Sequence, residues 1–200
     1  MDNGTSVIID LASRYAAAFG IVKASEMMSA VSVTKEDNQY QLDFFDDFDE
    51  QDEEVKIVYD KTVISFGSML FGESTNIFAP PMIMDFDRDK NLIETETNGE
   101  DNVIVERWGT KPWEISMRGL LIDVEKRKYP SEKIRDLHRL FKINDKLEVF
   151  GKQFVEKDIF YIYFKNVSIR ALEGFGDTVQ FNFIASAIKE STWTLKEPNK

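Results

Sequence analysis

The chain has 200 residues, of which 42% are hydrophobic, and this is enough to bury the core of one domain, with room for an appended arm. Its formal net charge of −11 argues against a protein that wraps nucleic acid, because phosphate binding needs a basic surface, although a surface that DNA slides past would suit this sign. It contains no cysteine, which excludes disulfides, zinc–thiolate sites and cysteine nucleophiles, and no apolar run approaches the roughly 18 residues of a membrane span, so we expect no membrane insertion.

The first 42 residues differ from the rest of the chain and predict an N-terminal helical arm. Thr5 or Ser6 can cap a helix that Gly20 ends. The apolar residues of this helix recur at helical spacing and form one stripe: Ile8, Leu11, Tyr15 and Phe19. A second, less regular helical segment covers residues 25–33. Because residues 1–20 lack the basic start and continuous apolar stretch of a signal peptide, we expect a soluble chain that is not processed.

A dense acidic segment follows, from Asp43 to Glu54, with eight carboxylates in twelve residues. Like charges at this density repel one another, which predicts a solvated linker. In the alternative interpretation, Phe44, Phe45 and Phe48 anchor the segment in a partner's groove. In both cases the segment separates the helix from the rest of the chain, so we expect the apolar stripe to be buried on a neighbouring subunit or another protein.

From Val55 to about residue 190 the pattern is that of β-strands. Two prolines interrupt the apolar run Ile77–Phe86, and Asn98-Gly99 between two strand-like segments predicts a hairpin. The expected strands are residues 55–59, 77–86, 92–97, 103–108, 113–123, 147–150, 160–164 and 179–185. Many non-local strands with one covering helix indicate an α+β fold or a mainly antiparallel β sandwich.

The strongest amphipathic pair in the chain is a strand over residues 113–123 and a helix over 131–141. Gly119 in this strand indicates a bulge or a close approach of two backbones. The helix presents one apolar stripe and is therefore expected to cover the sheet. The residues expected to be buried together are Ile115, Met117, Leu121, Leu137 and Phe141.

The sequence contains candidate metal-binding and catalytic residues, but none of them matches a complete motif. Four carboxylates occupy positions 1, 3, 5 and 12 of an EF-hand loop: Asp85, Asp87, Asp89 and Glu96. Position six, which needs glycine, is Lys90, so alternation along an exposed strand explains the spacing better. His138 is the only histidine and has no partner carboxylate at a telling spacing, and the glycine-rich loops and nucleophile motifs of common enzymes do not occur. We therefore expect no catalytic, cofactor-binding or metal-binding residues, and a hydrolase with unrecognised carboxylate chemistry is the least supported class.

The segment Glu106–Asp123, followed by Tyr129-Pro130, spaced apolar residues over 134–141 and a closing hairpin, resembles the central motif of tail-tube-like proteins of phages and contractile injection machines. It is similar to baseplate adaptor proteins, to distal tail proteins and to a Bacteroidetes phage family of unknown function. The resemblance implies a split β-barrel or sandwich whose copies form a homo-oligomeric ring, sixfold in symmetry. The N-terminal arm and the acidic segment have no counterpart in it.

The resemblance implies a structural subunit of a tail or baseplate, assembled in the cytoplasm of a bacterial host and then part of the virion. Its partners would be further copies and other tail or baseplate proteins, with DNA or effectors passing through the ring. The alternative is a monomeric adaptor that docks through the acidic-aromatic segment. The expected organisation is an arm over 1–42, a linker or docking segment over 43–54, a tail-tube-like β domain over 55–190 and a polar tail over 191–200.

Overall fold

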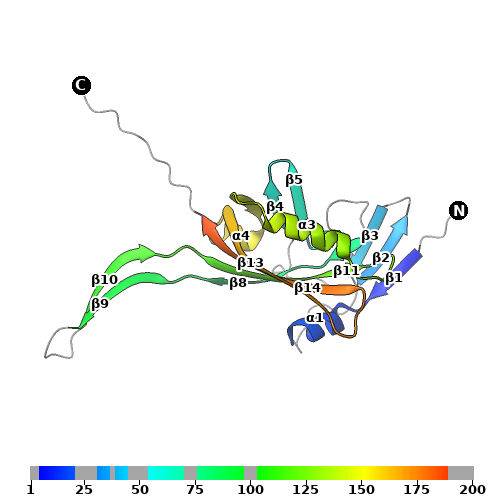
Figure 1. The fold of residues 1–200 in the computed structure, drawn as a ribbon, viewed down its shortest axis with the longest axis horizontal. Helices are drawn as coiled ribbons and strands as arrows, with labels where there is room; N and C mark the ends of the chain where they lie inside the picture. The colour runs from blue at the N-terminus through cyan, green and yellow to red at the C-terminus, as the bar shows by residue number, and fades with distance from the viewer. Residues whose placement is uncertain are drawn as a thin grey trace, which may run out of the picture.

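The structure is a computed structural model of the protein, and it describes residues 5–20, 31–36, 39–44, 54–69, 76–96 and 103–188. In these ranges the chain forms mostly antiparallel β-sheets with few helices, as the strand pattern predicted. Figure 1 shows the elements in space, and one hairpin extends well beyond the others. Within the described ranges, no helix combines the length and apolar character needed to cross a bilayer.

The main sheet has nine strands and is built around three long ones, β11 (Glu114–Asp123), β13 (Tyr161–Ala171) and β14 (Thr178–Ile188). The strand order is β5-β4-β12-β13-β14-β11-β7-β6, with β8 also paired to β11. The shorter strands are β4 (Val55–Tyr59), β5 (Thr62–Phe66), β6 (Ser68–Met69), β7 (Ile77–Ala79), β8 (Ile83–Asp87) and β12 (Leu147–Phe150). The two prolines separate β7 from β8, because proline cannot donate to a β-ladder.

One face of the main sheet packs under α3 (Ser131–Phe141), while the short α4 (Lys152–Val155) precedes β13 (Figure 1). The predicted core pair is confirmed: Ile115, Met117, Leu121 and Leu137 are buried in one cluster, and Phe141 packs against it. The ring of Phe141 lies 6.4 Å, centroid to centroid, from that of Phe164 on β13. The helix therefore covers the sheet as its apolar stripe predicts.

Gly119 marks a close approach, as predicted, although the neighbour is a side chain. It pairs with Phe181 across the β11–β14 ladder. A Cβ atom built on Gly119 would lie 2.5 Å from Cζ of Phe181 and 3.2 Å from Cγ of Met82. The Phe181 ring thus occupies the space that a side chain at position 119 would need.

The opposite face of the sheet is covered at one end by the N-terminal part of the chain. There, β1 (Thr5–Ile9), β2 (Val31–Glu36) and β3 (Gln39–Phe44) form a separate three-stranded sheet, and α1 (Leu11–Phe19) follows β1. A second buried cluster joins these elements to the main sheet: Ile9, Leu11, Tyr15, Val33, Phe78, Leu120, Ile122 and Val124. After Gly119, β11 therefore buries side chains on both of its faces, whereas we predicted one buried face from the sequence.

The N-terminal part contains the predicted helix, but the helix begins at Leu11 and not after Thr5 or Ser6. Residues 5–9 form a strand, and Asp10 caps the helix by accepting a hydrogen bond from the Ser13 backbone N–H at 3.0 Å. Gly20 ends the helix in the left-handed conformation (φ 69°), as predicted.

Of the expected boundaries at residues 42 and 54, only the second agrees with the structure, in which β4 begins at Val55. The first falls inside β3, which pairs with β2 through its whole length. Residues 31–33 of the second expected helix are in β2, and residues 21–30 lie outside the described part. Of the proposed aromatic anchors, Phe44 ends β3, while Phe45 and Phe48 lie outside the described residues.

Candidate assembly surface

The apolar stripe predicted for contacts with a neighbour is largely used within the chain itself. Leu11 and Tyr15 are 0% and 1% exposed, and the Tyr15 hydroxyl donates to the Pro81 carbonyl. Phe19 is half-buried. Only Ile8, on β1, has the exposure that an intermolecular contact needs, at 66%. The interpretation of Leu11 and Tyr15 as intermolecular contacts is therefore corrected: these residues complete the core.

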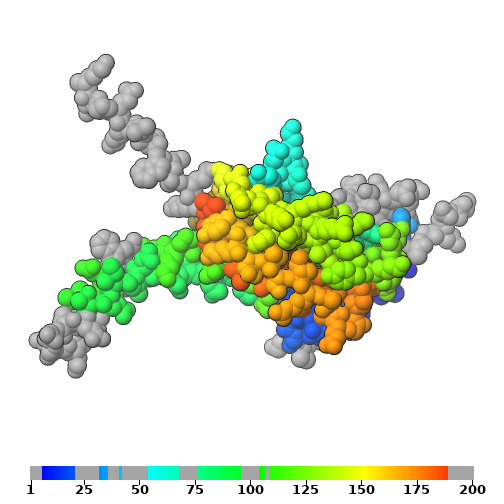
Figure 2. Space-filling view, in the orientation of Figure 1, coloured from blue at the N-terminus to red at the C-terminus, as the bar shows by residue number. Residues whose placement is uncertain are grey.

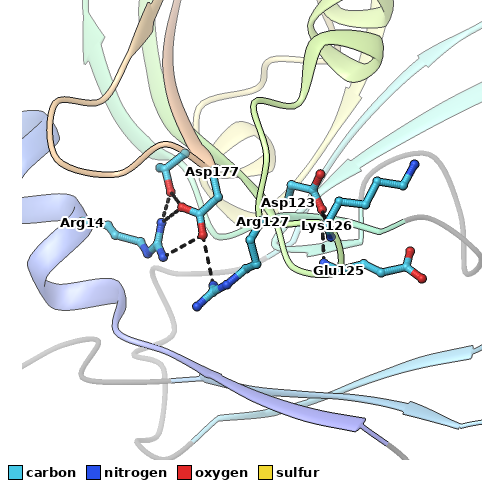
Figure 3. A network of polar contacts seen from close by, with 7 residues as sticks. Arg14, Asp123, Glu125, Lys126, Arg127 and Asp177 are labelled. Carbon is cyan, nitrogen blue, oxygen red and sulfur yellow. Dashed lines mark hydrogen bonds and ion pairs between the residues drawn. The ribbon is translucent and has the colours of Figure 1, made fainter.

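A buried ion pair also holds α1 in place (Figure 3). The Arg14 guanidinium donates to Asp177 Oδ1 at 2.6 Å and to the Thr178 hydroxyl, and both acidic and basic side chains are almost fully shielded, at 11% and 7% exposure. Arg127 reaches the other Asp177 oxygen at 3.1 Å. Next to it, Asp123 accepts two backbone N–H bonds and closes the turn after β11. This network could not be predicted from the sequence, since an arginine on a polar helix face carries no signal of a partner 163 residues away.

The most distinctive exposed element is the hairpin of β9 (Lys90–Glu96) and β10 (Val103–Thr110). From here on we call this hairpin the arm; it is distinct from the N-terminal helical arm expected from the sequence. The pairing confirms the predicted hairpin and forms a two-stranded sheet of its own. Figures 1 and 2 show that it projects from the body of the protein, in green. A two-stranded ribbon is only marginally stable in water by itself.

Polar contacts at its base hold the arm to the body. The Arg88 guanidinium donates to the Lys111 carbonyl at 2.9 Å and to the Thr110 hydroxyl at 2.5 Å, and it lies 5.3 Å from the Trp113 ring centroid. Lys111 donates its backbone N–H to the Asp89 carbonyl at 2.9 Å and its ammonium group to the Asp89 carboxylate at 3.2 Å. These contacts fix the direction in which the arm leaves the sheet.

Both faces of the arm expose apolar side chains. On one face Ile93 and Ile104 are 51% and 54% exposed, and on the other Leu92 and Val105 are 44% and 47% exposed. In each case the two residues are diagonal neighbours across the ladder. A ribbon that is apolar on both sides and stands away from the core exposes surface that ordinary monomers cover.

The sheet face opposite α3 is polar along the half that α1 leaves uncovered. There Ser116 and Asn182 lie within 3.3 Å of each other, and Arg118 pairs with Asp85 at 2.7 Å. Lys165 pairs with Glu114 at 3.3 Å nearby. Strand β8 bounds this half and pairs only with β11 in the described part of the chain, so its outer backbone groups are available to a further strand.

The carboxylates with EF-hand spacing are spread over an extended segment. Asp85 and Asp87 lie on β8, Asp89 follows it and Glu96 ends β9, while the first and third of the aspartates pair with Arg118 and Lys111. Among the described residues, no three acidic or histidine side chains gather in a metal-binding arrangement. His138 is exposed on α3. Strand alternation accounts for the spacing.

No curated protein matches the chain. A family model described as a domain of unknown function, DUF6046, matches residues 77–198. The matched range begins at β7 and includes the arm, β11, α3 and the paired β13 and β14. Because the match covers more than half of the 200 residues, the chain belongs to the DUF6046 family.

Proposed function

We propose that this protein is a non-enzymatic structural subunit of a phage tail or baseplate, or of a related injection machine, with a tail-tube-like β domain that assembles into a sixfold ring. The proposal starts from the resemblance of Glu106–Asp123 and the following helix to tail-tube-like proteins. The single observation that supports it most is the arm. In this proposal the protein is located in the virion, after assembly in the host cytoplasm.

The arm supports assembly because its exposed apolar side chains need a partner. Ile93 and Ile104 on one face, and Leu92 and Val105 on the other, would be shielded if neighbouring copies packed against the ribbon. A contact between the arm of one copy and a different surface of the next is head-to-tail, and such contacts close into rings when the rotation between copies allows it. The free edge of β8 offers a second place where copies can join.

The charge of the chain suits a ring through which DNA passes. A net charge of −11 opposes tight binding of phosphates, so DNA would not be held in transit. The uncovered polar face beside β8 is the candidate for the wall of the channel, because its charged residues are already paired: Arg118 with Asp85, and Lys165 with Glu114. Other tail or baseplate proteins would contact the remaining surfaces, including the exposed Ile8.

The test compares the full chain with a variant that lacks the arm. Lys90 and Thr110 are paired at the base of the hairpin, so a two-residue Asn-Gly turn can replace residues 91–109 and join them. We expect the full chain to sediment as an assembly, about 139 kDa for six copies of 23.2 kDa, and to form rings in electron micrographs. The armless variant should unfold cooperatively but remain a monomer. A full chain that stays monomeric at all concentrations contradicts the proposal.

The alternative of a monomeric adaptor gives a different result in the same experiment. An adaptor that docks through Phe44, Phe45 and Phe48 stays a monomer with or without the arm, at 23.2 kDa for the full chain. Its binding to a partner would be lost when these three residues are replaced by serine. The ring proposal instead predicts that the serine variant still assembles.

A further inference from the structure

We infer that the hollow at the base of the arm receives the arm of a second copy of this chain. The inference rests on the proposed function, because it names the surface that one subunit offers to the next. The hollow has a volume of about 580 Å³. Its lining combines two cations and one carboxylate with aromatic and apolar side chains: Arg88, Lys157, Asp158, Trp113, Phe160 and Ile188.

The hollow is assembled from several elements that the sheet brings together. Trp113 precedes β11, Ile188 ends β14, and Phe160 precedes β13, so the ends of three central strands meet there. Lys157 follows α4, and its ammonium group lies 4.3 Å from the Phe86 ring centroid. Because these groups are fixed by the core strands, the hollow has a defined shape before anything binds.

Two features of the hollow indicate that it is incomplete in a single chain. The Phe160 ring, at its rim, is 54% exposed, which is unusual for a large aromatic side chain. The buried indole N–H of Trp113 has no acceptor within the described part of the protein. Buried donors of this kind are rare and are commonly satisfied by a ligand or water. An occupant with apolar side chains would cover the exposed Phe160 ring.

The arm has the complementary chemistry. On its more exposed face, Ile93 and Ile104 provide the apolar surface, and Glu106 lies beside them, directly across the ladder from Ile93. Residues 91–109 of the sequence contain five acidic residues and one basic residue, Arg107, and the carboxylates of Glu94 and Glu106 are exposed. In the hollow the two cations, Arg88 and Lys157, outnumber the one carboxylate, Asp158, so its net charge is opposite in sign to that of the arm. We assign the Ile93 face to this contact, with Glu106 next to Lys157 of the second copy.

Disulfide trapping tests the contact directly, because the chain has no cysteine of its own. Two full-length variants, Ile104→Cys and Phe160→Cys, carry tags of different size and are mixed under oxidising conditions. We expect a covalent heterodimer. The matched control replaces Ile104→Cys by Leu92→Cys, which lies on the other face of the arm and should give little product. A double variant of one chain should cross-link between copies and not within a copy.

Charge reversal provides a second measurement that does not depend on cysteine geometry. Glu106→Lys and Lys157→Glu should each weaken assembly about tenfold or more, and the combined variant should recover most of the loss. Glu94→Lys, on the opposite face, and Lys61→Glu, on the exposed β4–β5 turn, are the controls and should change assembly little.

The outcomes separate this inference from the proposed function. Rings that form without the Ile104–Phe160 cross-link and without charge recovery would overturn the inference and leave the ring proposal standing. Cross-linking within one chain, or through Leu92, would also overturn it. A chain that never associates would overturn both.

Discussion

Replacing Gly119 by alanine tests how closely β11 and β14 are packed. Gly119 is outside the left-handed region, so alanine brings no backbone strain, and the cost comes from the added methyl group alone. That group would lie 2.5 Å from Phe181 Cζ, against 3.4 Å or more in ordinary contacts, so the ring has to move by about 0.9 Å. Phe181 is 1% exposed and lies 5.5 Å from the rings of both Phe66 and Phe183, which limits this movement.

Overpacking of a core by a methyl group costs about 1 to 3 kcal/mol, and the confined ring places Gly119→Ala in the upper half of this range, about 2 to 3 kcal/mol. The urea midpoint of the full chain measures it, and the melting temperature should fall by about 4 to 12 °C. Gly176→Ala is the matched control, because no atom lies within 4 Å of the position that its methyl group would take and its φ is not positive. It should change the free energy of unfolding by less than about 1 kcal/mol.

A double variant shows whether the Phe181 ring is the cause. In Gly119→Ala/Phe181→Leu the smaller leucine side chain leaves room for the methyl group. The double variant should therefore lose less stability than the sum of the losses in the two single variants. A cost for Gly119→Ala below about 0.5 kcal/mol, equal to that of Gly176→Ala, would refute the close packing described here.

Three further predictions concern the core and the acidic strand. Leu11→Ala should destabilise the full chain by about 2 to 5 kcal/mol, since the side chain is fully buried, and an effect confined to assembly with no loss of stability would contradict this placement of α1. Leu137→Ala should cost a similar amount in urea unfolding, whereas less than about 1 kcal/mol would mean that α3 does not cover the sheet. Saturating calcium should leave the melting temperature nearly unchanged, because Asp85 pairs with Arg118 on a strand; a large rise would reveal a site.

The elements with a strong local pattern could be predicted from the sequence. The strand β11 and the helix α3 carry clear apolar periodicity, and Asn98-Gly99 indicated the β9–β10 hairpin, since that dipeptide favours a tight turn. That Gly119 allows a close approach could also be inferred, but the identity of its neighbour, Phe181, depends on the register between two strands far apart in the chain.

The N-terminal part was harder for a physical reason. Ile8, Leu11 and Tyr15 happen to share a helical spacing although Ile8 belongs to a strand, and Asp10 with Ser13 was the overlooked signal of the true helix start. The near-continuous apolar run after Gly119 is typical of a strand buried on both faces, but we predicted only one buried face for it. Which segment covers the second face is decided by contacts over more than a hundred residues, and these leave no local pattern.

The Arg14–Asp177 pair also determines when the fold can be completed during synthesis, because its second residue is made late. The two residues are 163 positions apart, so at about 5 to 20 residues per second the ribosome adds Asp177 roughly 8 to 30 s after it adds Arg14. Through this interval Leu11 and Tyr15 have no finished core to enter, and β11 lacks its long neighbour β14. The nascent chain therefore carries exposed apolar surface until β14 is translated, and surface of this kind is prone to aggregation. Faster translation or a lower temperature should change the yield of folded protein more than its final stability.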